Sequence, residues 1–197
     1  CTERSRRRAR LVIRNIVSRM HIEMALTYPE RYPVDGDTGK RHFKAFREWL
    51  RRQNVKGVFW MQEFQRRGAP HFHALLTHPV DRSRMAAAWF RIVGSGDPKH
   101  LKHGTHYDWI REHNRIASYY CEYMLKLDQK RVPDGFENVG RFWGYSDCLL
   151  TCRVHSFHGS LRDLARLIRQ DRRRYIAKCR GWGFKWKWKG RGFTFWD

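Results

Sequence analysis

Apolar residues recur along this chain at two spacings, one typical of helices and one typical of strands. Helical spacing predicts helices over residues 2–19, 40–53, 85–93, 110–127 and 160–175. Alternating or β-rich runs predict strands over residues 21–28, 55–64, 71–77, 139–157 and in the tail from 182 to 196, whereas residues 99–107 are polar and irregular. Because these elements mix without a strict strand-helix-strand rhythm, we expect an α+β fold with one mostly antiparallel central sheet flanked by helices.

No linker or repeat interrupts the chain, so we expect a single domain over residues 1–197. Residues 1–19 form a basic N-terminal arm or helix in this interpretation, and residues 181–197 form a basic, aromatic C-terminal hairpin. The start is arginine-rich and begins at Cys1, without an apolar leader, so we expect a piece of a longer protein.

The charge of the chain indicates a polyanionic partner. Lys and Arg number 41 against 19 Asp and Glu, which gives a formal net charge of +22 over 197 residues. Arginine supplies most of these cations, and its planar guanidinium suits phosphate oxygens and stacks on bases. We therefore favour nucleic acid over an acidic protein as the partner, and no apolar run is long enough to cross a membrane.

Cysteine and histidine usage adds little to this interpretation. Five scattered cysteines fit a reducing compartment, so we expect the cytoplasm of the host cell. Cys148, Cys152, His155 and His158 carry zinc-ligand atoms, but zinc needs a compact knuckle and the segment is predicted to be a strand. His100, His103 and His106 lie in the polar stretch, where we assign no site.

The most informative segment is a hairpin that brings two histidines and a carboxylate together. A three-residue loop Arg66 to Gly68 with glycine last is a favoured hairpin geometry, and it places Glu63 directly opposite His71. Alternation then puts His73 on the same face. Such a set suits Mn²⁺, Mg²⁺ or Zn²⁺ with open coordination positions, although a His-x-His strand that only faces solvent is the simpler alternative.

A second candidate is the helix over residues 110–127. Tyr119, Tyr123 and Lys126 share one face at i, i+4 and i+7. A tyrosine hydroxyl can attack a phosphodiester when a metal or a cation such as Lys126 assists it, because its unassisted pKa is about 10. Taken alone, an aromatic stripe on a helix is more often part of a core.

Basic side chains near these segments predict contacts with nucleic acid. Arg66 and Arg67 lie at the hairpin tip, beside the proposed metal. Lys185, Lys187 and Lys189 alternate with tryptophans in the tail, as in proteins that stack bases on rings and follow phosphates with cations.

Three motifs in this order resemble a known family. His71-Phe72-His73 is similar to the His-hydrophobe-His motif of the HUH endonucleases. Tyr119-x-x-x-Tyr123-x-x-Lys126 resembles the two-tyrosine motif of their rolling-circle replication initiators, and the run from Met24 to Pro29 resembles the first-strand motif of that branch. Glu122 departs from the pattern, since two-tyrosine initiators often carry Lys there, which leaves the division of labour between the tyrosines open.

The resemblance implies site-specific nicking and rejoining of single-stranded DNA. It implies that His71, His73 and a third residue, here Glu63, hold Mg²⁺ or Mn²⁺. Tyr123 is then the first nucleophile, forming a 5′-phosphotyrosine, and Tyr119 the second. The expected partners are single-stranded or hairpin origin DNA and host proteins such as a helicase, because the chain has no Gly-rich Lys-Ser/Thr loop for ATP. The alternatives are a transposase of the same superfamily and a non-catalytic domain that binds single-stranded nucleic acid.

Overall fold

The computed structural model describes residues 2–123, 131–149, 162, 166, 169, 185–189 and 192–196. The chain divides into two compact units, Cys1–Thr151 and Cys152–Asp197. The first unit holds all the elements that surround the candidate site. Within the described residues no helix is long and apolar enough to cross a membrane.

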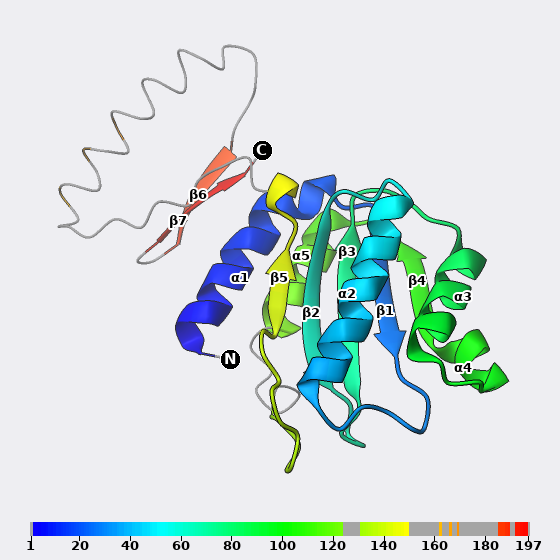
Figure 1. The fold of residues 1–197 in the computed structure, drawn as a ribbon. Helices are drawn as coiled ribbons and strands as arrows, with labels where there is room; N and C mark the ends of the chain where they lie inside the picture. The colour runs from blue at the N-terminus through cyan, green and yellow to red at the C-terminus, as the bar shows by residue number, and fades with distance from the viewer. Residues whose placement is uncertain are drawn as a thin grey trace. The chain divides into compact units, whose positions relative to one another are not determined.

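The first unit is an α+β fold built on one sheet (Figure 1). Its five strands are all antiparallel and lie in the order β4-β1-β3-β2-β5. The strands are β1 (Ile22–Thr27), β2 (Val58–Phe64), β3 (Pro70–Leu76), β4 (Thr105–Trp109) and β5 (Trp143–Tyr145). The helices are α1 (Glu3–Ile16), α2 (Gly36–Arg52), α3 (Arg82–Val93), α4 (Pro98–His103) and α5 (His113–Tyr123), with short 3₁₀ turns η1 (Val17–Arg19) and η3 (Asp147–Leu149). The predicted fold class is confirmed.

Side-chain caps fix where the helices begin. Thr2 accepts a hydrogen bond from the backbone N–H of Ser5 at the start of α1, and Asp35 and Asp81 do the same for Thr38 and Arg84 at α2 and α3. Each oxygen satisfies an N–H that has no partner inside its helix. Helix α3 ends at Gly94, whose φ of 66° is the left-handed conformation common just after a helix.

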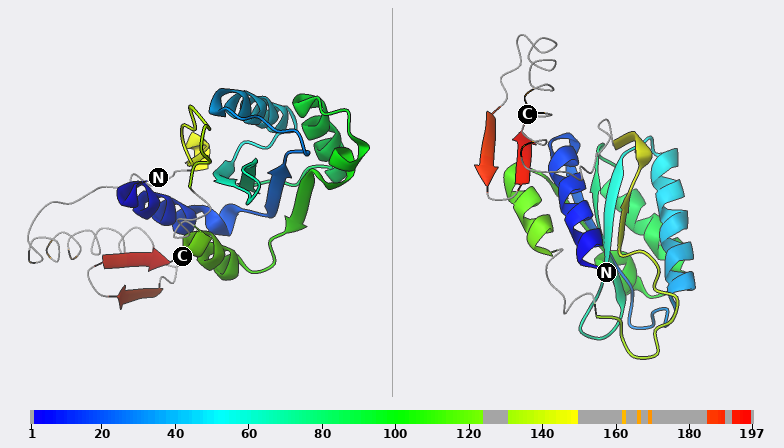
Figure 2. Two further views of the ribbon diagram at one scale, coloured as in Figure 1. Left: turned by 90° about the horizontal axis from the view of Figure 1, so that it is seen from below. Right: turned by 90° about the vertical axis from the view of Figure 1, so that its left-hand side faces the viewer.

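Two hydrophobic layers cover the two faces of the sheet, and Figure 2 shows helices on both sides of it. On one face α2 and α3 pack against alternate residues of the central strands, and the Phe43 and Phe72 rings stack at 4.4 Å. On the other face α1, η1 and α5 pack against Phe59, Met61 and Leu75. The second face is the one on which Glu63, His71 and His73 lie, because residues two apart in a strand share a face.

Two segments differ from the sequence prediction. Residues 99–107, expected to be irregular, contain most of α4 and the start of edge strand β4. Only one face of β4 is even half-buried, so its sequence lacks the apolar alternation that identifies a strand. In the described part of the strand expected over 139–157, residues 139–149, the structure has the short strand β5 and then turns into η3 at Asp147. Most of the helix expected over 160–175 lies outside the described residues.

The second unit contains one described sheet. Strands β6 (Lys185–Lys189) and β7 (Gly192–Trp196) pair antiparallel, with Trp186 opposite Phe195 and Trp188 opposite Phe193. The tail is therefore an antiparallel strand pair, as its alternation predicts.

Candidate functional site

The β2–β3 hairpin has the predicted register. Gln65 donates its N–H to the carbonyl of Ala69 (2.9 Å), and Gly68 donates to the carbonyl of Gln65 (2.8 Å). The φ of Gly68 is 85°, which glycine adopts without steric cost. This loop places Glu63 opposite His71, and the face of the sheet that they share also carries His73.

Glu63 and the two histidines are in close contact on this face. Oε2 of Glu63 lies 3.7 Å from Nε2 of His73, and the rings of His71 and His73 are 4.5 Å apart between centroids. Glu63 is only 3% exposed. A carboxylate that is so deeply buried must be stabilised by positive or polar groups, because burial disfavours the charged form.

Burial also determines the charge of His71. Burial lowers the pKa of His71 and the positive charge of Arg67 lowers it too, while a hydrogen bond to the backbone of Leu26 raises it, so that the pKa is about 4 in all. The imidazole is therefore neutral at physiological pH. A neutral imidazole is the form that binds a metal.

Thr27 orients the His71 ring. Its Oγ1 lies 3.1 Å from Nδ1 of His71, so the other ring nitrogen, Nε2, points away from Thr27. The backbone carbonyl of Thr27 accepts hydrogen bonds from Nε1 of Trp89 (2.9 Å) and from Nε2 of His100 (2.9 Å). These two contacts fix Thr27, and Thr27 in turn fixes the ring that would hold a metal.

Sequence reasoning misses this supporting layer. The sequence places His100 in a polar stretch without a role, but the residue is buried and also bonds Ser95 through Nδ1 (2.8 Å). The available signal is Asp97-Pro98, a cap followed by a first-turn proline, which predicts a helix at His100. Thr27 lies inside the quoted first-strand motif, but the motif alone gives its hydroxyl no task.

The ligand types of Glu63, His71 and His73 suit a divalent cation, but the three side chains do not surround a common point. One carboxylate and two imidazoles, one of them held neutral, provide the mixed N and O ligands that Mn²⁺ and related cations accept. As the described residues stand, no group of three or more His, Cys, Asp or Glu side chains is arranged so that it could hold a metal ion. Glu63, His71 and His73 would therefore have to close around a cation when it binds.

The predicted tyrosine helix packs on the same face of the sheet. In α5, Ala117 and Tyr120 join the hydrophobic layer that contains Phe59 and Leu75, and the Tyr120 and Phe59 rings are 6.3 Å apart between centroids. The segment expected to carry the nucleophile thus lies against the histidine strand.

The described tyrosines of α5 have opposite environments. Tyr120 is fully buried, and burial together with the nearby carboxylate of Glu23 raises its pKa well above the ordinary value. Tyr119 is 39% exposed. The helix reaches Tyr123, but the Tyr123 side chain and Lys126 lie outside the described residues, so their predicted roles stay predictions.

The two hairpin-tip arginines are also in different environments. The Arg67 guanidinium donates to the carbonyls of Tyr28 (2.6 Å) and Pro29 (2.7 Å) and lies over the Tyr32 ring, whose hydroxyl donates to the Arg67 carbonyl. These contacts fasten the tip to the segment after β1. Arg66 is exposed at the same tip.

The remaining predicted residues lie largely outside the described part of the structure. Lys185, Lys187 and Lys189 are in β6, whose side chains are not described. Of the zinc-ligand types considered, Cys148 is exposed in η3, and Cys152, His155 and His158 are outside the described residues.

Comparison with known proteins identifies the family of the chain. No curated protein and no solved structure shows significant similarity to the chain. The family model for the replication-associated protein ORF2 matches residues 22–128, which is 107 of the 197 residues and spans β1, the hairpin and α5. The chain therefore belongs to the replication-associated protein ORF2 family, a family of phage and plasmid replication initiators.

Proposed function

We propose that the chain is a metal-dependent endonuclease and strand transferase of the HUH type, which nicks single-stranded origin DNA to start rolling-circle replication. The observation that carries the proposal is the packing of α5 on the sheet face that bears Glu63, His71 and His73. A tyrosine from this helix and a metal held by these side chains would then act on the same phosphate. Membership of a replication family favours this reaction over transposition.

In this mechanism the tyrosine oxygen attacks the scissile phosphorus. The tyrosine hydroxyl gives up its proton to solvent, a bond forms between its oxygen and phosphorus, and the bond from phosphorus to the 3′ oxygen breaks. The leaving oxygen takes a proton from solvent to become a 3′ hydroxyl. The chemistry that a bound Mg²⁺ or Mn²⁺ supplies is polarisation of the phosphate, which makes it a better electrophile. Rejoining reverses the step, with a 3′ hydroxyl attacking the phosphotyrosine.

Each residue has a defined task in the proposal. Tyr123 is the first nucleophile, Tyr119 the second, and Lys126 neutralises charge near them. His71 and His73 bind the cation through ring nitrogens, and Glu63 supplies the anionic ligand. Tyr120 has no reacting role, because burial raises its pKa and keeps its hydroxyl protonated.

The test is formation of a covalent protein–DNA adduct. The protein is incubated with single-stranded oligonucleotides selected for binding, in Mn²⁺ or in EDTA, and adducts are located by denaturing gel and mass spectrometry. We expect an adduct at Tyr123 or Tyr119 in Mn²⁺ and none in EDTA.

Substitutions complete the test. The double variant Tyr119→Phe with Tyr123→Phe should form no adduct, and His71→Ala should require far more Mn²⁺. Tyr107→Phe is the matched control, since Tyr107 packs in the layer on the opposite face of the sheet. An adduct in the double variant equal to that of the wild type would overturn the mechanism. Tight binding without any adduct would favour the second candidate, a domain that binds single-stranded nucleic acid without cutting it.

A further inference from the structure

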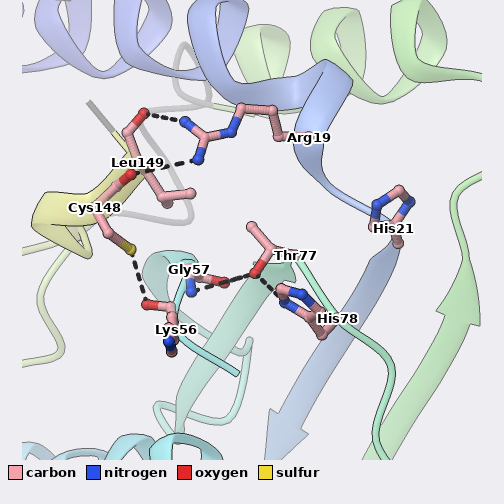
Figure 3. A pocket seen from close by; sticks show the side chains of 8 residues that line it. All are labelled: Arg19, His21, Lys56, Gly57, Thr77, His78, Cys148 and Leu149. Atoms are coloured by element: carbon pink, nitrogen blue, oxygen red, sulfur yellow. Dashed lines mark hydrogen bonds between the residues drawn. The ribbon is translucent and has the colours of Figure 1, made fainter. Parts of the chain in front are cut away.

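A pocket of about 410 Å³ opens at the end of the sheet away from the hairpin tip (Figure 3). Its lining comes from four separate segments: η1, the chain just before β2, the chain just after β3, and η3. Gly57 lies six residues before Glu63, and Thr77 lies six residues after His71 and four after His73, so at about 3.4 Å per residue the pocket is about 14–20 Å from the candidate metal ligands. It is therefore a separate site.

Cations line this pocket without any acidic residue. Arg19 and Lys56 are exposed around it, together with His21 and His78, and none of its lining residues is acidic. Arg19 is held in place, since its guanidinium donates to the carbonyls of Leu149 (3.0 Å) and Cys148 (3.4 Å). A cation fixed in this way loses little conformational freedom when an anion binds.

Hydrogen bonds tie together two of the segments that line the pocket. The backbones of Gly57 and Thr77 pair through the Thr77 N–H (3.0 Å), and the Thr77 hydroxyl contacts Gly57 N–H (3.2 Å) and Nδ1 of His78 (2.9 Å). A Cβ at Gly57 would lie 2.4 Å from a Thr77 methyl, so only glycine allows this close approach.

A second pocket of about 230 Å³ continues the basic surface along α2. Lys56 lines both pockets, so they are neighbours on the surface. The two linings together contain five Lys or Arg residues and one carboxylate: Arg19, Lys44, Arg47, Arg51 and Lys56 against Glu48. This run of concave, cationic surface is what a polyphosphate chain requires, whereas a small anion would fill only part of it.

We propose that these two neighbouring pockets, which share Lys56, bind the phosphodiester backbone of DNA next to the nicking site. The inference rests on the proposed function, because it assumes that the same DNA reaches the metal ligands. A separation of about 14–20 Å corresponds to roughly four to six base pairs of duplex, at about 3.4 Å per base pair. The surface would hold the flanking DNA and so place the scissile phosphate at the histidine strand.

The test compares two variants of equal charge in the full-length chain. The pocket variant combines Lys44→Gln, Arg51→Gln and Lys56→Gln. The control combines Arg91→Gln, Lys99→Gln and Lys102→Gln, which are equally exposed on α3 and α4. Each lowers the formal net charge from +22 to +19. Both are made in the Tyr119→Phe, Tyr123→Phe background so that the DNA stays intact, and thermal melting verifies folding.

Affinity is measured by fluorescence anisotropy between 50 and 300 mM salt. The pocket variant should bind at least about tenfold more weakly at 100 mM, and the slope of log K against log salt should fall by about two to three, since each lost phosphate contact removes about 0.7–0.9. Lys56→Gln alone should lower the slope by about one. Equal losses in the pocket and control variants would overturn the proposal.

Two probes distinguish the source of the phosphates. A 30-nucleotide single strand and a hairpin with a single-stranded tail are titrated in parallel. A loss confined to the hairpin identifies the duplex stem as the ligand, and an equal loss with both identifies the single strand. Adduct formation is measured separately, in proteins that keep both tyrosines. If the nuclease proposal fails, the pocket variant should still bind DNA more weakly than the control variant. If the pocket proposal fails, the wild type should still form the adduct.

Discussion

Thr27→Val tests how the His71 ring is positioned. Valine keeps the shape and β-branching of threonine but removes the hydroxyl that lies 3.1 Å from Nδ1 of His71. When Nε2 binds a metal, Nδ1 carries the proton and donates it to this hydroxyl, which fixes the ring and raises its basicity. The substitution leaves the Thr27 carbonyl, and its bonds to Trp89 and His100, in place.

The expected loss of metal affinity is about tenfold. Removing a supporting partner of a metal-bound histidine costs about 10–100-fold, and a single hydrogen bond contributes about 0.5–1.5 kcal/mol. The hydrogen bond to the backbone of Leu26 remains, so the lower end of the range applies. At pH 7 protonation of His71 does not interfere, since its pKa is about 4.

Isothermal titration of Mn²⁺ into the wild type, Thr27→Val and Thr27→Ser measures the effect. The serine variant keeps a hydroxyl and should bind within about threefold of the wild type, because the hydrogen bond is retained. Equal affinities for valine and wild type would refute the role of the hydroxyl. Equal losses for serine and valine would show that packing, not the hydrogen bond, positions the ring.

Three further predictions concern stability. Phe72→Ala should lower the free energy of unfolding by about 3–5 kcal/mol, because this ring is 1% exposed in the core; a loss under about 1.5 kcal/mol in urea would contradict the packing. Gly57→Ala should lower the free energy of unfolding by about 1–3 kcal/mol, since its Cβ would lie 2.4 Å from a Thr77 methyl. Gly39→Ala should raise it by about 0.5–1 kcal/mol, because a Cβ there would have nothing within 4 Å. A higher melting temperature for Gly57→Ala than for Gly39→Ala would refute this. Burial lowers the pKa of His100 from its ordinary 6.5, so as the pH falls the unfolded chain takes up the proton first, and the free energy of unfolding should decrease below about pH 6.5. His100→Gln should make that decrease smaller, and an unchanged dependence of stability on pH would contradict this.

The hairpin register could be predicted because it depends on local rules alone. A loop of three residues with glycine last determines which residues face each other, and Glu63 therefore meets His71. Helix α2 and the strands of the hairpin were equally predictable, since their buried residues recur at regular spacing. Such features need no knowledge of distant parts of the chain.

The layer behind the histidines could not be predicted, because it depends on which strands become neighbours. Thr27 meets His71 only because β1 pairs with β3, and 44 residues separate the two in sequence. His100 reaches the Thr27 carbonyl from α4, a helix too short to give a periodic signal. The basic pocket likewise combines segments near residues 19, 56, 78 and 148.

Two adjacent tyrosines in α5 differ in burial, so that one can pack the helix while the other stays exposed. Successive helical residues point about 100° apart, so Tyr120 can be buried against Phe59 while Tyr119 remains 39% exposed. Burial that raises the pKa of Tyr120 makes its hydroxyl a poorer nucleophile, and the same burial holds the helix against the histidine face. The unreactive tyrosine thus fixes the position of its neighbours in the helix. In the proposed mechanism, a nucleophile on α5 can therefore be exposed to DNA while the packing of Tyr120 still holds the helix against the histidine face.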